Sequence, residues 1–228
     1  MNWLPTFNEI LLAVLIIAWV GIVIISSELL RAKGIMSTYS SRKIVHIAII
    51  VPIILAYTMV DRSLYPIIIT GIAFLFNYFT APVSPIKSFR LKVFSEGHKW
   101  GTVLFSFSVF LIFLFWYYQP AIGLIAGSAL CFGDGFSGMI GKKYGKIRPS
   151  FLKGKSIEGS IVFFLTSLIG SVLLFLIVGV QVNQSLLVIT IISLLVATVT
   201  EVFSPGGYDN VIVPIITGFT AQLLFIVF

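Results

Sequence analysis

Hydrophobic residues recur along this chain in long runs, which short polar or charged segments separate. Each of eight runs approaches the roughly 20 residues that a helix needs to cross the ~30 Å hydrocarbon core of a bilayer. The pattern therefore predicts an all-α fold, a polytopic membrane helix bundle that forms a single integral domain over residues 1–228. The expected helices are residues 8–29, 44–60, 64–82, 101–118, 120–134, 158–180, 185–203 and 209–228.

Basic residues lie almost entirely in three of the connecting segments, and they orient the bundle. Fourteen of the fifteen Lys and Arg residues fall between the first and second, third and fourth, and fifth and sixth helices; only Arg62 lies on the other side. Short loops rich in Lys and Arg stay in the cytoplasm. We therefore predict a cytoplasmic cation-rich face and two outside termini, in the cell membrane if the chain is prokaryotic.

The weakest helix boundary is Gln119-Pro120, which interrupts an apolar stretch from Thr102 to Phe132. A proline can kink a membrane helix instead of ending it. One kinked helix would, however, divide the basic loops between the two faces of the membrane. The charge distribution therefore predicts a tight hairpin at this point.

Composition narrows the possible partners. The chain is 58% hydrophobic and 10% charged, whereas a soluble domain has about 25% charged residues. The net charge of +7 does not indicate nucleic acid, because the cations lie in short loops beside the membrane, where lipid headgroups or phosphates are the better partners. Cys131 is the one cysteine, so no disulfide framework is expected. Glu9 precedes the first apolar run, which we expect to be a retained helix rather than a signal peptide.

Six of the eight acidic residues are predicted at the same face as the cations. Ionisable groups at membrane depth are costly and usually face a partner or a polar cavity. Glu28 has such a partner in Arg31, one helical turn away. Glu9 and Asp61 are expected outside, and the six at the cation-rich face are Glu28, Glu96, Asp134, Glu158, Glu201 and Asp209.

A glycine-rich segment, residues 133–146, carries the most informative of these carboxylates. Asp134 lies between two glycines, and Lys142 and Lys143 follow in the same segment. Glycines leave backbone N–H groups approachable and permit left-handed turns. Such amides with ammonium groups can hold a polyphosphate, while the carboxylate binds Mg²⁺ or accepts a proton from an attacking hydroxyl. A simple turn with anchoring lysines is the alternative, and phosphate chemistry is favoured.

The same loop continues to Gly154-Lys155-Ser156, which is similar to the end of a Walker A motif. That motif needs a glycine five residues before Gly154, where Pro149 stands, so a P-loop is excluded. Ser156 is instead expected to cap the sixth helix, with Glu158 in its first turn. A helix N-terminus beside lysines favours anions.

Two further clusters lie at the cation-rich face. In residues 41–46, one helical face can present Arg42, Lys43 and His46 together. The alternative is that Arg42 and Lys43 only anchor the topology and that His46 is a hydrogen-bonded helix residue. In residues 201–210, a Pro-Gly-Gly turn brings Glu201 and Asp209 together. The pair is either a metal-binding or hydroxyl-positioning element or a simple hairpin in which Asp209 caps the last helix, and the sequence favours neither. His46 and His98 on separate segments are weak evidence for zinc.

Together these elements resemble the CTP-dependent lipid-alcohol kinases, the family of dolichol kinase, phytol kinase and fungal-type diacylglycerol kinase. The resemblance covers residues 41–46, 133–160 and 201–214, with a further element at Glu96 and Gly101, and extends from about residue 40 to the end. The chain lacks the additional N-terminal helices of dolichol kinases, so a phytol- or polyprenol-type member is expected.

The resemblance implies CTP as phosphoryl donor, bound by residues 133–159, and a lipid alcohol as acceptor. Mg²⁺ is the cofactor that the carboxylates and phosphoryl transfer lead us to expect. The resemblance also implies an essential cationic pair, a nucleotide region and a last element, at the matching positions Arg42 and Lys43, Asp134, Gly141, Lys155 and Glu158, and Asp209 with Asn210. It does not settle which carboxylate is the base, and the other expected site residues follow from the clusters described above. The expected catalytic residues are Asp134, Arg42, Lys43, Glu201 and Asp209, with Asp134, Glu201 and Asp209 as metal ligands. The expected nucleotide-binding residues are Gly133, Asp134, Gly138, Gly141, Lys142, Lys143, Lys155, Ser156, Glu158, Asn210 and His46.

The sequence therefore favours a kinase that phosphorylates a bilayer-dissolved alcohol at the cytoplasmic interface. Two other classes stay open. A cytidylyltransferase would form a CDP-lipid and release pyrophosphate instead of CDP. A transporter or flippase for an anionic solute would need charges deep within the spans and access from both sides, which this distribution of charges does not favour.

Overall fold

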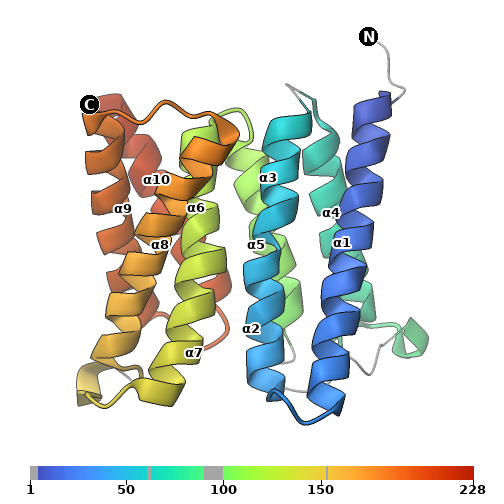
Figure 1. The fold of residues 1–228 in the computed structure, drawn as a ribbon, viewed down its shortest axis with the longest axis horizontal. Coiled ribbons are helices and arrows are strands. Elements are labelled where there is room, and N and C mark those ends of the chain that lie inside the picture. Colours follow the sequence, from blue (N-terminus) through green and yellow to red (C-terminus); the bar gives the residue numbers. More distant parts are fainter. Residues whose placement is uncertain (1–4, 61–62, 90–99, 153) are drawn as a thin grey trace.

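The computed structural model describes residues 5–60, 63–89, 100–152 and 154–228. Within these ranges the chain is helical and contains no strand (Figure 1). The elements are α1 (Phe7–Ala32), α2 (Thr38–Ala48), α3 (Ile50–Met59), α4 (Tyr65–Thr80), η1 (Lys87–Phe89), α5 (Gly101–Trp116), α6 (Pro120–Ser128), η3 (Ala129–Gly133), α7 (Asp134–Tyr144), η4 (Ser150–Leu152), α8 (Ile157–Val178), α9 (Gln184–Phe203) and α10 (Asp209–Val227).

Each predicted span has a counterpart in these helices. α2 and α3 follow each other within one span, Thr38–Met59, and α6, η3 and α7 form another, Pro120–Tyr144. Among the described residues, six spans are long and apolar enough to cross a membrane. α4 and α5 have 16 residues each and measure about 24 Å at ~1.5 Å per residue, somewhat less than the ~30 Å hydrocarbon core. The prediction of a polytopic helical membrane bundle is confirmed.

The chain reverses direction at Gln119-Pro120, as predicted. α5 ends at Trp116, and Pro120 is the first residue of α6, a position where proline's missing N–H costs no hydrogen bond. Tyr117 donates from its hydroxyl to the carbonyl oxygen of Val60 (2.6 Å), which fixes the turn against the end of α3.

Because of this hairpin, the α1–α2 and α7–α8 connections, which carry basic residues, lie at the same end of the bundle (Figure 1), as the charge distribution predicted. Figure 1 shows both chain ends at one end of the bundle, and the α1–α2, α7–α8 and α9–α10 connections at the other. The second of these ends, which we call the cation-rich end, carries Arg31, Lys33, Lys142, Lys143 and Arg148. Arg62, Glu96 and His98 lie outside the described residues.

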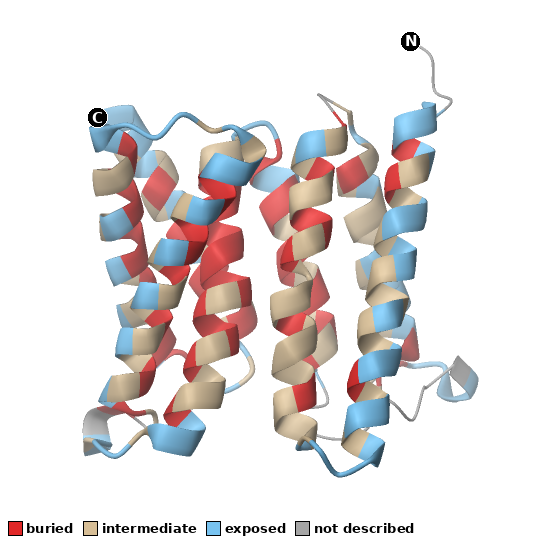
Figure 2. Ribbon diagram, viewed as in Figure 1, coloured by how far each residue is buried: buried red, intermediate tan, exposed pale blue. Residues whose placement is uncertain are grey.

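α6 lies at the centre of the bundle. It packs against α5, α8 and α10, and Figure 2 shows buried residues along α6 where α1 has mainly exposed or half-buried ones. Apolar side chains such as Ile17, Ile169 and Leu223 point outward and stay exposed, as expected for surfaces that face lipid. The buried interior thus lies around α6, whose continuation α7 leads to the cation-rich end.

Candidate active site

A cavity of about 930 Å³ opens at the cation-rich end between α2, α7, the start of α8 and the α9–α10 turn. Of the fifteen residues predicted for the site, twelve line this cavity. They are Arg42, Lys43, His46, Asp134, Gly138, Gly141, Lys142, Lys155, Ser156, Glu201, Asp209 and Asn210. Segments that are far apart in the sequence therefore meet in one place.

Asp134 is a buried carboxylate at the centre of one group of charges. It is 9% exposed, and both its carboxylate oxygens accept hydrogen bonds from Lys43 Nζ, at 2.6 and 2.7 Å. His46 Nδ1 lies 3.5 Å from Oδ2 of the same carboxylate, longer than an ordinary hydrogen bond. The imidazole stacks on the ring of Phe105, with centroids 3.9 Å apart. Arg42, Lys43 and His46 share the cavity-facing side of α2, as the spacing predicted.

A second lysine–carboxylate group lines the same cavity. Lys155 Nζ donates to the side chain of Glu201 (2.6 Å) and to its backbone carbonyl oxygen, and lies 3.8 Å from an oxygen of Asp209. The α9–α10 turn makes this possible, because Gly207 has a φ of +91°, a conformation that suits glycine. The predicted approach of Glu201 and Asp209 is confirmed, and Lys155 joins them. Asp209 is the first residue of α10, and Tyr208 holds the cap position.

The glycines of residues 133–145 do not form the expected loop. The segment stays helical through Tyr144, and none of its glycines has a positive φ, so the expectation of left-handed turns there was wrong. The glycines serve close helix packing instead. A Cβ at Gly138 would lie 2.3 Å from the Tyr39 hydroxyl oxygen, and one at Gly141 would lie 3.2 Å from Gly159 Cα. Backbone approach between α7 and its neighbours, rather than a phosphate-binding loop, explains the pattern.

A π-helical segment, η3, immediately precedes Asp134. Such segments insert a residue into an α-helix and often occur at functional sites. Here the irregularity lies between the apolar α6 and the polar α7, and it sets the rotation at which Asp134 enters the cavity. The span therefore extends ten residues beyond the expected end at Asp134.

The start of α8 matches the prediction in part. Ser156 caps the helix by accepting the N–H of Gly159 (3.1 Å), and Glu158 lies in the first turn. The N–H of Ile157 donates to the carbonyl oxygen of Ile147. These N–H groups are already used, so the helix end contributes to anion binding chiefly through its dipole.

Three residues predicted for nucleotide binding lie outside the cavity lining. Gly133 faces Phe163 and Ser167 of α8. Lys143 extends over the ring of Tyr144. Glu158 accepts the backbone N–H groups of Lys146 and Ile147 (2.9 and 3.1 Å) and so fixes the α7–α8 loop.

Arg148 and Tyr39 are among the cavity residues that the sequence analysis did not assign to the site. Arg148 donates to the carbonyl oxygens of Gly154 (2.7 Å) and Gly141 (2.8 Å), which shapes the loop that carries Lys155. The ring of Tyr39 lies 4.4 Å from Lys142 Nζ, a cation–π contact. Tyr39 stands four residues before Lys43 on α2, and this spacing was the available signal.

The possible metal ligands of the cavity are separate carboxylates rather than one cluster. In the described part of the chain, no three His, Cys, Asp or Glu residues are arranged as a metal site. Glu28 forms the expected ion pair with Arg31 (2.8 Å). The carboxylates that remain for a cation are Asp134, Glu201 and Asp209, each beside a lysine.

The chain is similar to several curated proteins. No family model matches the chain, and no solved structure matches it. It is 29% identical over 65% of its length to the soybean (Glycine max) protein named probable phytol kinase 2, chloroplastic, and 27% identical over 86% to the phytol kinase of Synechocystis sp. (strain ATCC 27184 / PCC 6803 / Kazusa). Phytol kinase 1, chloroplastic, of Arabidopsis thaliana is 25% identical over 62% of the chain.

The matched region spans about half of the plant relatives, 56% of the soybean and 50% of the Arabidopsis protein, and 84% of the cyanobacterial one. The cyanobacterial match extends over most of both chains, and all three relatives are named as phytol kinases or probable phytol kinases. The chain is therefore related to the phytol kinases, and the resemblance to lipid-alcohol kinases that its motifs indicate is confirmed.

Proposed function

We propose that this protein is a CTP-dependent kinase that phosphorylates the hydroxyl of a membrane-embedded lipid alcohol of the phytol or polyprenol type. The observation that carries the proposal is the cation-lined cavity at one end of an apolar helix bundle. At such a place a bilayer-dissolved alcohol and a water-soluble nucleotide can meet. The names of the relatives support the reaction type, and the distribution of basic residues supports a cytoplasmic position for this end.

The cavity suits a nucleoside triphosphate in size and charge. Its volume of about 930 Å³ lies near the upper end of the ~300–1,000 Å³ typical of small-molecule sites. Five cationic side chains line it against three carboxylates. The cations are Arg42, Lys43, Lys142, Arg148 and Lys155.

The two lysines that hold carboxylates are suited to a change of partner. An ammonium group has three donors, so Lys43 and Lys155 can bind phosphate oxygens while they stay near Asp134 and Glu201. The negative phosphate oxygens then take over part of the role of Asp134 and Glu201 as the counter-charges of these lysines. This exchange would let nucleotide binding free a carboxylate for the chemical step.

The carboxylates fit Mg²⁺ that arrives with the nucleotide. Mg²⁺ is usually bound by one or two carboxylates together with substrate phosphates and water, not by an all-protein cage. Asp134, or Glu201 together with Asp209, provides that donor set. When bound, the ion would neutralise charge on the phosphate oxygens during transfer.

In the proposed transfer, the alcohol oxygen forms a bond to the γ-phosphorus while the bond from that phosphorus to the β–γ bridging oxygen breaks. CDP leaves with the electron pair of that bond. The hydroxyl proton passes to a cavity carboxylate, for which Asp134 is our first candidate because it is buried beside both Lys43 and His46. Lys43 neutralises negative charge that spreads over the transferring oxygens.

The test is phosphorylation of phytol by the purified protein with γ-labelled CTP and Mg²⁺. We expect labelled lipid phosphate and CDP, and no product in EDTA. Lys43→Gln should lose activity, whereas Lys33→Gln, a loop cation outside the cavity lining, should keep it. Equal rates with ATP would overturn the choice of nucleotide, and release of pyrophosphate would identify a cytidylyltransferase.

The orientation is tested by labelling single cysteines in intact cells with a membrane-impermeant thiol reagent. Lys146→Cys, at the cation-rich end, should stay unlabelled until the cells are opened. Asn183→Cys, before α9 at the opposite end, should react at once. The reverse result would place the cavity outside the cell.

A further inference from the structure

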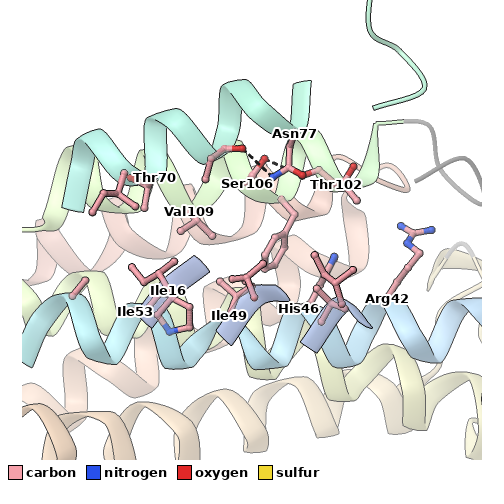
Figure 3. Close-up of a pocket in the computed structure, with 18 of the residues that line it drawn as sticks. Ile16, Arg42, His46, Ile49, Ile53, Thr70, Asn77, Thr102, Ser106 and Val109 are labelled. Atoms are coloured by element: carbon pink, nitrogen blue, oxygen red, sulfur yellow. Dashed lines mark hydrogen bonds between the residues drawn. The ribbon is translucent and has the colours of Figure 1, made fainter. Parts of the chain in front are cut away.

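A second cavity, of about 210 Å³, lies inside the bundle between α1, α2, α3, α4 and α5 (Figure 3). Its walls are mainly apolar, and the figure shows Ile16, Ile49, Ile53 and Val109 along its length. Of the five helices around this cavity, only α2 also lines the candidate active site. We call it the apolar cavity.

The apolar cavity and the cation-lined cavity share two residues, Arg42 and His46. Figure 3 places both at the same end of the apolar cavity. His46 is 5% exposed, and its buried Nδ1 has no hydrogen-bond partner among the described residues. The Asp134 carboxylate lies 3.5 Å from this nitrogen. Because buried polar atoms in proteins are nearly always paired, the nitrogen is placed to meet a polar group such as the hydroxyl of a ligand.

Away from this end, the polar wall residues bond to their own helices. Ser106 donates to the carbonyl oxygen of Thr102 (3.0 Å), Thr70 to that of Pro66 (2.9 Å), and Asn77 to that of Ala73 (3.0 Å). Such donors need no ligand. The cavity therefore suits a hydrocarbon chain with one polar group, located at its His46 end.

The dimensions limit what the cavity holds. From His46 to Ala56, both on its wall, the helical rise is about 15 Å, half of the ~30 Å bilayer core. A volume of about 210 Å³ is below the ~300 Å³ at which sites for drug-sized ligands begin. It accommodates the hydroxyl-proximal part of one chain, and the remainder of a long lipid must lie in the bilayer.

The surrounding helices provide a lateral way in. α1 packs against α2 and α3, while α4 packs against α5. The Trp19 indole N–H holds α1 by donating to the carbonyl oxygen of Ala48 (2.9 Å), and Glu9 accepts a hydrogen bond from Ser63 ahead of α4. α1 and α4 thus flank the cavity from two separately packed groups, which the Glu9–Ser63 hydrogen bond joins at the end away from the cation-rich end.

We propose that the apolar cavity is the acceptor site of the kinase, and that it binds the hydroxyl-proximal part of a single-chain prenyl alcohol entering between α1 and α4. Arg42 and His46 meet the hydroxyl and direct it into the cation-lined cavity. This inference rests on the proposed function for its chemistry, but the binding of the alcohol can be measured without any phosphoryl transfer.

The test uses Ala73→Phe, because Ala73 lines the apolar cavity from α4 and is itself exposed, so the new ring needs no core rearrangement. A prenyl alcohol with a photoreactive group near its hydroxyl is crosslinked to the purified protein without nucleotide, and the labelled peptides are sequenced. We expect label on the residues of α1, α2, α3, α4 or α5 that line the apolar cavity. Ala73→Phe should reduce it roughly tenfold or more, because the ring occupies the chain's space. Ala18→Phe, an exposed position on α1 outside the lining, is the matched control and should label as wild type does.

The kinetic counterpart is a raised KM for the alcohol in Ala73→Phe with an unchanged KM for CTP. Label confined to other helices, or equal label in Ala73→Phe and Ala18→Phe, would overturn the acceptor site. Equal competition by a diacylglycerol would overturn the single-chain substrate. A wild-type protein that crosslinks as expected but phosphorylates no prenol would support the binding site and refute the proposed function.

Discussion

The two lysine–carboxylate groups of the cation-lined cavity have the same chemistry but different supports. Lys43 and Asp134 project from two packed helices, and their side chains are only 14% and 12% exposed. Lys155 comes from the α7–α8 loop and reaches Glu201 and Asp209 on either side of a glycine turn. Its own side chain is 26% exposed. The first pair joins two packed helices, whereas the second depends on a lysine from a loop.

This difference indicates a division of labour. A group on packed helices keeps its position to the accuracy that phosphoryl transfer needs. A group on loops can adjust as a ligand arrives, as binding residues on loops commonly do. We therefore propose that the Lys43–Asp134 pair serves the chemical step and that Lys155 captures phosphate, and substitutions can separate the two roles.

The largest effect is expected for Asp134→Asn. Loss of a general base costs roughly 10²–10⁴-fold in rate, and removal of one partner from a buried ion pair costs about 3–5 kcal/mol of folding stability. The protein should therefore lose both activity and thermal stability, because Lys43 is left buried with no counter-charge. Turnover of phytol and thermal unfolding in detergent measure the two losses.

The double variant Lys43→Met with Asp134→Leu separates these losses. Replacing a buried ion pair with apolar residues of similar size is often neutral for stability. We expect thermal stability to return towards that of the wild type while activity stays absent. If the double variant is active, the chemistry does not depend on this pair.

A smaller effect on stability is expected for Lys155→Met. Glu201, which is 8% exposed, loses its ammonium partner, and an unsatisfied buried polar group costs about 1–3 kcal/mol. Asp209 stays more exposed and tolerates the loss better. The KM for CTP should rise more than kcat falls, which steady-state kinetics would measure. A fall in kcat alone would place Lys155 in the chemical step and end the division of labour.

Glu158→Gln should affect the Lys155 group and leave the Lys43–Asp134 pair unchanged. The carboxylate accepts the N–H groups of Lys146 and Ile147, so a weaker acceptor loosens the loop that carries Lys155 and leaves α2 and α7 in place. We expect a modest rise in the KM for CTP and faster hydrogen exchange in residues 145–156. Unchanged exchange there would show that Arg148 alone is enough to hold the loop.

The smallest effect is expected for Lys143→Gln. This cation extends over Tyr144 and does not line the cavity, whereas its neighbour Lys142 does. Activity and stability should stay close to wild type, and Lys142→Gln in the same assay should raise the KM for CTP. Equal losses in both variants would mean that the outward lysine also reaches the nucleotide.

The sequence alone predicted the helical class, the spans, the hairpin at Gln119-Pro120 and the end of the bundle at which the charged motifs meet. Each of these follows from local quantities. The cost of burying a charge in lipid and the length of an apolar run are properties of neighbouring residues. The helical spacing of Arg42, Lys43 and His46 is equally local, and their shared face was predictable for the same reason.

Only the tertiary structure decided which cation meets which carboxylate. Lys43 and Asp134 are 91 residues apart, and their contact depends on the approach of α2 to α7, which Gly138 permits by leaving room for Tyr39 and Lys43. The same glycines indicated a loop when they were considered one segment at a time, because a glycine-rich pattern does not distinguish a turn from a close helix contact. The apolar cavity was equally hidden, since it depends on how five helices pack, and no single segment of the chain encodes that packing.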